Sequence, residues 1–408
     1  GLFVSNFVGK SAFAAVNLIM PFLMGISALG FMIGTGGSAI VAKTLGEGKI
    51  ENANEYFSML VYITAIGGII IAILSMFLVK PVAILFGASD TLLDNCILYG
   101  RILCISLPAF MLQNVFQSFF VTAEKPHLGL RVIVIAGVTN MVLDFLFVAV
   151  FHLGLPGAGF ATVCGEFIGG LFPLFYFGRK NSSLLKLGKT HFHGRILLKT
   201  CTNGSSELMT NLSSSVVNAL YNMQLMKFAG EDGVAAYGTI MYVNFIFVSI
   251  FFGYAIGSAP IVSYHYGANN QDELKNLFHK SIRLIGTWAV SLFIIAQLIA
   301  TPLATLFVGY DQGLFELTRS GFRLYSFAFL INGFNIYGSA FFTALNNGLL
   351  SALISFLRTL VFQMAVVLLL PLLLGINGVW CSVAIAELLT LCVTGTFIVL
   401  KRNTYHYL

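Results

Sequence analysis

The stretch SAFAAVNLIMPFLMGISALGFMIGTGGSAIVA, residues 11–42, contains no charged side chain. This run, like five others in the chain, meets or exceeds the roughly 20 residues with which a helix crosses a hydrocarbon core of about 30 Å. A membrane β-barrel would instead alternate polar and apolar residues, a pattern that the sequence lacks. The sequence therefore predicts an all-α integral membrane protein. Further uncharged runs cover residues 56–79, 102–123, 233–271, 284–310 and 324–357.

The composition excludes a large water-facing surface. Of 408 residues, 58% are hydrophobic and 9% are charged, whereas soluble proteins carry about 25% charged residues. The formal net charge of +6 comes from lysines and arginines in short loops, so we reject nucleic-acid binding and expect the lipid bilayer as the surroundings. The six cysteines have no CxxC spacing, which favours apolar packing over disulfides or metal ligands.

The apolar segments predict eleven full spans, and the loop charges orient them. The linker at residues 181–195 and its flanks are rich in lysine and arginine, and every second loop is also basic. By the positive-inside rule, the linker and the C-terminus are cytoplasmic, in a multi-pass cell-membrane protein. The predicted spans lie near 13–42, 54–79, 91–122, 127–150, 156–178, 197–228, 233–265, 275–308, 313–345, 349–373 and 377–400.

An internal repeat divides the chain. A gapless shift of 221 residues aligns the two halves over more than 150 positions. We therefore predict two parallel six-helix lobes, at residues 1–180 and 196–408, joined by the cytoplasmic linker 181–195. Such halves suit alternating access, in which one lobe moves against the other about a central site. The matches include Gly36, Ile40, Val41 and Gly46 with Gly257, Ile261, Val262 and Gly267.

The repeat also bears on the start of the chain. The span 197–228 has a first-half counterpart of which only the last turns, GLFVSNF at residues 1–7, are present. We therefore expect the first helix to be truncated in this sequence. The alternative is a natural eleven-helix protein, which would leave the bundle asymmetric.

Polar residues inside the predicted spans mark candidate sites, because they are costly to place in hydrocarbon. Asp144 has Asn140 one helical turn earlier on the same face, and Thr162 and Glu166 repeat this spacing in the next span. A scaffold requirement would appear in both halves, so an asymmetry favours a functional site. The second-half counterparts of Asn140, Asp144 and Thr162 are Val361, Ala365 and Val383.

Carboxylate, amide and hydroxyl oxygens are the hard ligands that suit Na⁺. A carboxyl group away from water also favours its protonated form, so Asp144 could carry a proton instead. The structural alternative is a protonated Asp144 hydrogen-bonded to Asn140, which would merely hold helices together. The same ambiguity applies to a polar stripe along span 91–122, because such stripes also connect helices. The stripe consists of Tyr99, Ser106, Gln113 and Gln117.

Three further ionisable residues lie in the second half. Arg358 is deep in its span and needs an anionic partner, for which Glu207 and Glu387 are both candidates. Because Glu387 is the repeat counterpart of Glu166, a scaffold role for these two acids is also open. The sequence contains no phosphate-binding glycine loop, no HExxH and no GxSxG, so we predict neither an enzyme nor a bound cofactor.

Several motifs resemble those of the multidrug and toxic compound extrusion (MATE) family, especially its Gram-positive drug-exporter branch. The resemblance spans essentially the whole chain. It implies two six-helix lobes arranged in a V, and export of organic, often cationic, compounds driven by Na⁺ or H⁺. The motifs are FVGKSAFAAVNLIMPF at 7–22, IGTGGSAIVAKTLGEGK at 33–49, NMVLDFLFV at 140–148, GLPGAGFATV at 154–163 and YAIGSAPIVSYHYGANN at 254–270.

The resemblance also implies a cation site in the N-terminal lobe. Family members build it from an Asp late in the first helix, an Asn and an Asp four residues apart, and a Thr. Asn140, Asp144 and Thr162 match the last three, and Tyr99 matches a tyrosine of the same network. The first Asp would fall immediately before Gly1 and is absent from this sequence, so a Na⁺ site at these residues would lack one ligand.

Substrate contacts are implied for the same lobe. The resemblance places the amides of Gln113 and Gln117 at the drug cavity, and Glu166 is a further candidate substrate-binding residue. Some relatives use acids in the C-terminal lobe, but Ser214 and Asn332 stand at the corresponding places here. We therefore expect no cation site in that lobe.

These observations predict a monomeric secondary antiporter that exports small organic compounds in exchange for Na⁺ or H⁺. One alternative is a lipid-linked saccharide flippase of the same superfamily, which would need a strongly basic cavity, whereas Arg358 is the clear deep cation here. An integral-membrane transferase would need clustered acids or histidines near one interface. A channel is disfavoured by the two-lobe repeat.

Overall fold

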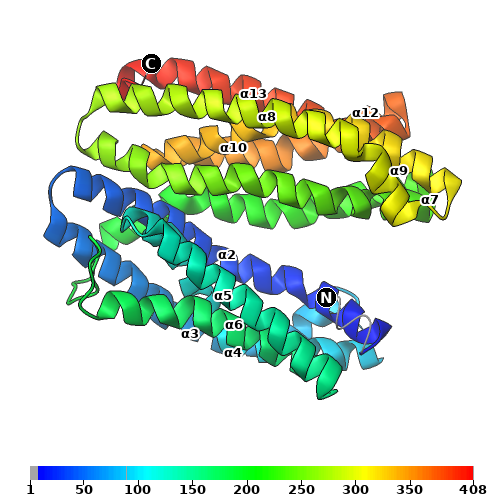
Figure 1. Ribbon diagram of the computed structural model, residues 1–408, viewed down its shortest axis with the longest axis horizontal. Helices are drawn as coiled ribbons and strands as arrows, with labels where there is room; N and C mark the ends of the chain where they lie inside the picture. Colours follow the sequence, from blue (N-terminus) through cyan, green and yellow to red (C-terminus); the bar gives the residue numbers. More distant parts are fainter. Residues whose placement is uncertain (1–7, 89, 408) are drawn as a thin grey trace. The chain divides into compact units, whose positions relative to one another are not determined.

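The computed structural model describes residues 8–88 and 90–407, and these form helices and short loops without a β-strand (Figure 1). The prediction of an all-α membrane protein is confirmed. In chain order the elements are α2 (Lys10–Gly46), α3 (Ile50–Leu85), α4 (Asp90–Thr122), α5 (Pro126–Asp144), the π-helical η1 (Phe145–Val150), α6 (Gly154–Gly178), α7 (Gly194–Gly267), α8 (Gln271–Val308), α9 (Gln312–Tyr325), the 3₁₀ turn η2 (Ser326–Ala328), α10 (Phe329–Ala344), α11 (Gly348–Phe356), the π-helical η3 (Leu357–Phe362), α12 (Gln363–Leu374) and α13 (Ile376–Tyr405).

Ten continuous helices within the described residues are long and apolar enough to cross a bilayer. Eleven spans were predicted, and the difference lies in α7, which joins the spans 197–228 and 233–265. Gly230 interrupts α7 with a φ of 62°, a conformation that glycine adopts at little cost because it has no Cβ. The chain folds back there, since the rings of Tyr221 and Tyr237 stack 5.5 Å apart. The α7 element is therefore a helical hairpin that contains two spans.

The structure divides into two compact units, Gly1–Gly204 and Ser205–Leu408, with the boundary inside α7. The order of elements in the first unit recurs in the second. The α3 helix begins at Ile50 and α8 begins at Gln271, 221 residues later. A turn recurs at the same distance, because Gly154 and Gly375 have φ angles of 65° and 58°. The repeat is thus a repeat of helix boundaries and glycine turns.

In the first unit α4 is the central helix, and it packs against α2, α3 and α6. Small residues bring these backbones together. A Cβ atom on Gly30 of α2 would lie 2.7 Å from the carbonyl oxygen of Met111 on α4, and one on Gly34 would lie 2.9 Å from that of Asn114. Close approach through small residues is typical of helices packed in membranes. In the second unit α9 and α10 occupy the equivalent place in the chain.

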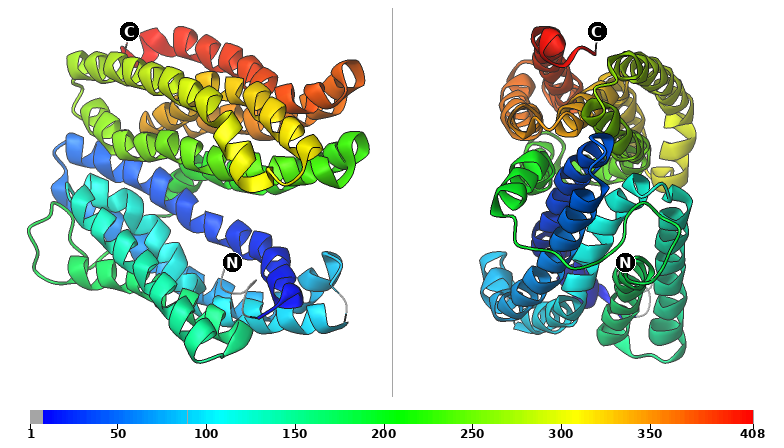
Figure 2. Two further views of the ribbon diagram at one scale, coloured as in Figure 1. Left: turned by 45° about the vertical axis from the view of Figure 1, so that its right-hand side comes forward. Right: turned by 90° about the vertical axis from the view of Figure 1, so that its left-hand side faces the viewer.

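Two features predicted from the sequence concern the ends of the first unit. The last turns of a truncated first helix, residues 1–7, lie outside the described residues. Of the predicted linker, residues 181–195, residues 181–193 form an extended loop at one end of this unit (Figure 2), and the last two residues are already in α7. The two units correspond to the halves related by the repeat, with the linker and the first turns of α7 in unit 1.

The linker is docked onto the first three turns of α3. The backbone N–H of Lys186 donates to Asn54 Oδ1 at 2.7 Å, and that of Gly188 donates to Ser58 Oγ at 3.0 Å. The Thr190 hydroxyl donates to the Glu55 carbonyl oxygen at 2.8 Å. The carboxylate of Glu55 also lies between two imidazoles of the linker, those of His191 and His193, at 3.2 and 3.3 Å. These contacts hold an otherwise irregular segment against the unit.

The docking contacts predict a difference in protease sensitivity. Asn54→Ala removes the acceptor of the Lys186 N–H, and a lost hydrogen bond costs about 1 kcal/mol. We therefore expect trypsin to cut after Lys186 or Lys189 roughly fivefold faster than in the parent protein, because local opening governs cleavage of docked loops. Time-resolved digestion of the purified protein measures this rate.

The matched control is Glu51→Ala, which changes an exposed side chain in the same turn of α3. It should leave the cleavage rate unchanged. Equal rates for the Asn54 variant and the parent protein would show that the side-chain acceptor does not hold the linker.

Candidate functional site

The polar residues predicted for the first unit come together where α4, α5 and α6 meet. The α5 helix ends at Asp144, and the π-helical turn η1 follows directly. Such turns are found inside longer helices and often accompany functional sites. Asn140 lies one turn before Asp144, and its Nδ2 donates to Thr162 Oγ1 of α6 at 3.3 Å. Tyr99 of α4, which is 4% exposed, lies beside Thr162.

A glycine makes this approach of α5 and α6 possible. A Cβ atom on Gly165 would lie 2.9 Å from the carbonyl oxygen of Ala136 and 3.1 Å from Cβ of Asn140. Any larger residue at position 165 would therefore push the Asn140 amide away from Thr162. The sequence spacing placed Asn140 on the same helix face as Asp144, and Thr162 on the same face as Glu166. The close packing at Gly165 sets the distance between Asn140 and Thr162.

Asp144 is half-buried, and its Oδ1 atom is enclosed without a hydrogen-bond donor among the described residues. Asn140 directs its amide to Thr162, and no hydrogen bond joins it to Asp144 within the described part of the chain. The structural alternative, in which a protonated Asp144 is hydrogen-bonded to Asn140, stays untested. Asp144 is close enough to Tyr99 to interact with it electrostatically, and Tyr99 in turn lies beside Thr162. The carboxylate of Asp144, the amide oxygen of Asn140 and the hydroxyl of Thr162 therefore supply oxygen atoms to one region, which we call the oxygen-rich set.

The three residues predicted to contact substrate differ in their surroundings. Glu166 Oε2 accepts a hydrogen bond of 2.5 Å from Ser106 of α4. The Gln113 amide packs against α6, because a Cβ atom on Gly169 would overlap with Gln113 Oε1. Gln117 is half-buried on the same stripe.

The Glu166 side chain also lines a small cavity of about 40 Å³ in the first unit. This volume holds a few water molecules and is far too small for a drug-sized compound. Its other walls are apolar, so the carboxyl group is the polar feature within it. The remaining lining residues are Met20, Leu23, Met24, Leu103, Leu107 and Phe110.

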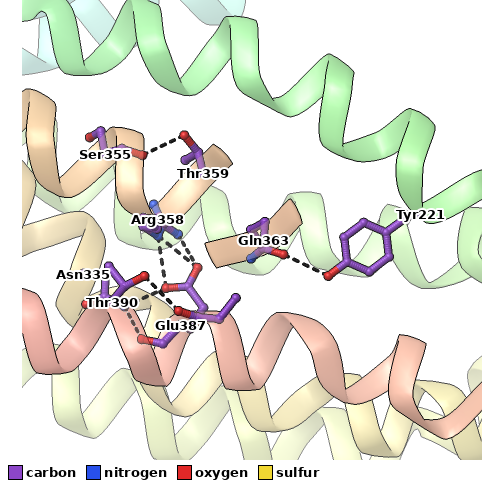
Figure 3. Close-up of polar contacts among 9 residues, drawn as sticks. Tyr221, Asn335, Ser355, Arg358, Thr359, Gln363, Glu387 and Thr390 are labelled. Atoms are coloured by element: carbon purple, nitrogen blue, oxygen red, sulfur yellow. Dashed lines mark hydrogen bonds and ion pairs between the residues drawn. The ribbon is translucent and has the colours of Figure 1, made fainter. Parts of the chain in front are cut away.

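The second unit resolves the question of the Arg358 partner (Figure 3). The guanidinium contacts the Glu387 carboxylate through Nη2 at 2.8 Å and through Nε at 2.9 and 3.0 Å. Asn335 of α10 donates to Glu387 Oε2 at 2.7 Å and to its carbonyl oxygen at 2.8 Å. Glu207 is close enough to interact electrostatically with Arg358, but the ion pair is with Glu387. Arg358 lies in the π-helical turn η3.

A buried hydroxyl cluster next to this ion pair was not predicted. The Ser339 hydroxyl lies 2.9 Å from that of Ser351 and 2.8 Å from that of Ser355, and the Thr343 hydroxyl lies 2.7 Å from Ser351. The signal was present in the sequence, because Ser339 and Thr343 are four residues apart, as are Ser351 and Ser355. The repeat strengthens it, since the counterparts of Ser351 and Ser355 are apolar, Leu130 and Val134.

The two positions used to argue against a cation site in the second unit have different surroundings. The Ser214 hydroxyl is exposed and donates to carbonyl oxygens of its own helix. Asn332 is buried. The expectation of no cation site there stays a prediction.

Comparison with known proteins places the chain in a family. A sequence profile of the MatE family matches residues 1–146 and 208–369, about three-quarters of the chain. The chain belongs to the MatE family. The matched segments of this MatE chain include Asn140 and Asp144, the helices α4, α9 and α10, and Arg358.

Relatives with names and solved structures agree with that assignment. Multidrug export protein MepA of Staphylococcus saprophyticus is 21% identical over 403 residues, which cover 98% of this chain and 87% of that protein. MepA of Staphylococcus haemolyticus is 23% identical over 381 residues, 93% and 83% of the two proteins. The outward-facing structure of a multidrug resistance MATE family transporter of the MOP superfamily matches with a TM-score of 0.93 at 22% identity, covering 99% and 91% of the two chains. The MATE fold of this chain is thereby shown.

The Arg358–Glu387 pair predicts a large stability effect. Glu387→Gln leaves the Asn335 amide an acceptor but leaves a buried guanidinium without its counter-charge, which costs roughly 3–5 kcal/mol. The exposed Arg319–Glu316 pair, at 2.7 Å, is the matched control, and Glu316→Gln should cost less than about 1 kcal/mol. Equilibrium unfolding in detergent measures both. Equal losses for the two variants would show that burial does not distinguish the pairs.

The contact of Gln113 with Gly169 predicts a packing effect. Gly169→Ala places a methyl group against the Gln113 amide, and overpacking costs roughly 1–3 kcal/mol. The double variant Gly169→Ala/Gln113→Ala should recover most of that loss. Gly137→Ala on α5 is the control, because nothing lies within 4 Å of its added Cβ. A double variant as unstable as Gly169→Ala alone would refute this packing role of Gln113.

Proposed function

We propose that this MatE chain is a secondary active transporter, not an enzyme, that exports small organic compounds in exchange for Na⁺ or H⁺. The observation that carries the proposal is the oxygen-rich set formed by Asp144, Asn140 and Thr162, with Tyr99 beside it. The relatives named Multidrug export protein support the substrate class. The bound cation would be the coupling ion, without a further cofactor.

The arrangement suits ion coupling for an electrostatic reason. A carboxylate enclosed at the edge of hydrocarbon is stabilised by a bound cation or by protonation, and it is destabilised when empty and charged. Conformations that bring water to Asp144 would favour loading or release of the cation or proton. Conformations that seal Asp144 from water would favour its cation-bound or protonated form. Coupling requires that the ion interact differently with the two conformations.

The repeat indicates which of the two units would carry the cation. Asn140, Asp144 and Thr162 have apolar counterparts in the second unit, whereas the glycine turns and helix boundaries are shared. The first unit would carry the cation and the two units would alternate. We further propose a monomer in the cell membrane with the linker and C-terminus in the cytoplasm, on the basis of the loop charges.

A saccharide-lipid flippase finds less support in the contacts. Such a substrate carries phosphate groups, and Arg358 is the deep cation that would have to bind them. Its guanidinium is already neutralised by Glu387 in two-point contact. Export of organic compounds is therefore the function that the contacts favour.

Efflux from proteoliposomes tests the proposal. The intact protein should export organic cations when an inward Na⁺ or H⁺ gradient is imposed, and Asp144→Asn should lower the gradient-dependent rate at least tenfold because the carboxylate charge is lost. Asp94→Asn is the control, since it makes the same chemical change elsewhere, on α4. Unchanged gradient-dependent efflux from the Asp144 variant would refute the role of this carboxyl group. Separate Na⁺ and pH gradients identify the ion.

A further inference from the structure

A cavity of about 390 Å³ lies where α6 ends and the linker begins. Its lining combines aromatic and basic side chains with the first residues of the linker loop. Apolar and cationic groups occur side by side within this short segment of chain. The lining residues are Phe172, Phe175, Tyr176, Arg179, Lys180, Asn181 and Ser182.

The charge of this cavity is uncompensated. Arg179 and Lys180 are both exposed, and no carboxylate lies within ion-pair distance of either among the described residues. A second cavity of about the same volume, beside α4, contains Arg101 together with Asp94, so its lining charges cancel. The cavity at the end of α6 therefore attracts anions, and the one beside α4 does not.

The loop that carries these cations has a defined shape. Asn181 Nδ2 donates to the carbonyl oxygens of Tyr176 and Arg179, at 3.1 and 3.0 Å. Asn181 Oδ1 in turn accepts from the backbone N–H and the hydroxyl of Ser183, at 2.9 and 2.6 Å. These bonds tie the loop to the last turn of α6. Arg179 and Lys180 are thereby held beside the helix end.

Further hydrogen-bond donors lie in the same segment of the chain. The backbone N–H groups of residues 180–182 have no acceptor among the described residues, and the Ser182 side chain is exposed. Consecutive free N–H groups bind anionic oxygens well. Together with a guanidinium and an ammonium group, they supply enough donors for the several oxygen atoms of a phosphate.

The other half of the cavity is apolar and faces outward. Phe172 and Phe175 are 47% and 62% exposed and lie three residues apart, so they share one face of α6. Since α6 is a membrane span, this face meets lipid chains. Tyr176 lies next to it at the helix end, where aromatic side chains with a polar tip favour the membrane interface.

We propose that this cavity binds an anionic phospholipid. The phosphate lies against Arg179, Lys180 and Ser182, and the acyl chains lie along Phe172 and Phe175. The assignment to the inner leaflet rests on the proposed orientation, in which the linker is cytoplasmic, whereas the binding itself does not. The bound lipid would lie at the start of the linker, which leads into α7, the helix in which the two units join.

Native mass spectrometry of the purified full chain in detergent tests the proposal. The probe is phosphatidylglycerol, with zwitterionic phosphatidylcholine as the lipid control. Arg179→Gln/Lys180→Gln should weaken phosphatidylglycerol binding roughly 10- to 30-fold, because two cations near the membrane surface are removed. Lys186→Gln/Lys189→Gln removes the same charge from the same linker outside the cavity and should keep binding within about twofold.

Two further arms identify the source of the phosphate. Phe175→Ser should weaken phosphatidylglycerol binding severalfold, because the variant lacks an aromatic contact for the acyl chains. Soluble glycerol phosphate should bind far more weakly than the lipid, because it has no acyl chains. Equal binding by the parent protein and the Arg179/Lys180 variant would overturn the proposal. So would equal losses in the two double variants, which would indicate general charge attraction. Efflux activity enters none of these readouts, so the lipid site and the transport function fail or succeed separately.

Discussion

The free-energy cost of placing polar groups in hydrocarbon determines how ionisable side chains are paired in both units of this protein. A charge at the centre of a span costs several kcal/mol, so each buried ionisable group needs a partner or a bound ion. Glu387 has a guanidinium and an amide, at 2.8 and 2.7 Å. Glu166 has a serine hydroxyl. Asp144 has neutral oxygen atoms nearby and an enclosed Oδ1 without a donor among the described residues. Of these three acids, it is the one with a buried carboxylate oxygen that has no hydrogen-bond partner among the described residues, which is the basis of the proposed cation site.

The repeat shows how one scaffold supports two kinds of polar centre. Glu166 and Glu387 are equivalent in the duplication, but the position of Arg358 is glycine in the first half, at Gly137. A permanent counter-charge makes the Glu387 site a fixed crosslink, because exchange of either partner would leave a buried charge unpaired. The first unit lacks that counter-charge at the equivalent place. A change of protonation at Glu166 would therefore break no ion pair with a residue at the position equivalent to Arg358.

The site predicted from sequence stays a prediction, and its most direct basis is helical spacing. Asn140 and Asp144, or Ser106 and Gln113, share a helix face because their spacing is close to whole turns. The prediction from sequence was incomplete where two helices must meet. Arg358 had two acidic candidates, and the packing of α13 against η3 selected Glu387. The amide of Gln113 packs on α6 because Gly169 has no side chain, a contact that the sequence did not predict, and its contact with substrate stays a prediction. Side-chain contacts between helices depend on how each helix is rotated about its axis and how deep it lies in the membrane. The sequence pattern of one helix does not determine either.

The sequence by itself determined the membrane environment, the spans and the duplication, because hydrophobic length and glycine positions are local properties of the chain. Only the tertiary structure decided the partner of Arg358, the hydroxyl cluster around Ser339 and Ser351, and the docking of the linker on α3. The reason is physical. Backbone hydrogen bonds in lipid are satisfied within each helix, so spans are readable one at a time. The polar side chains find partners on other helices, and those contacts exist only after packing has set helix rotation and spacing.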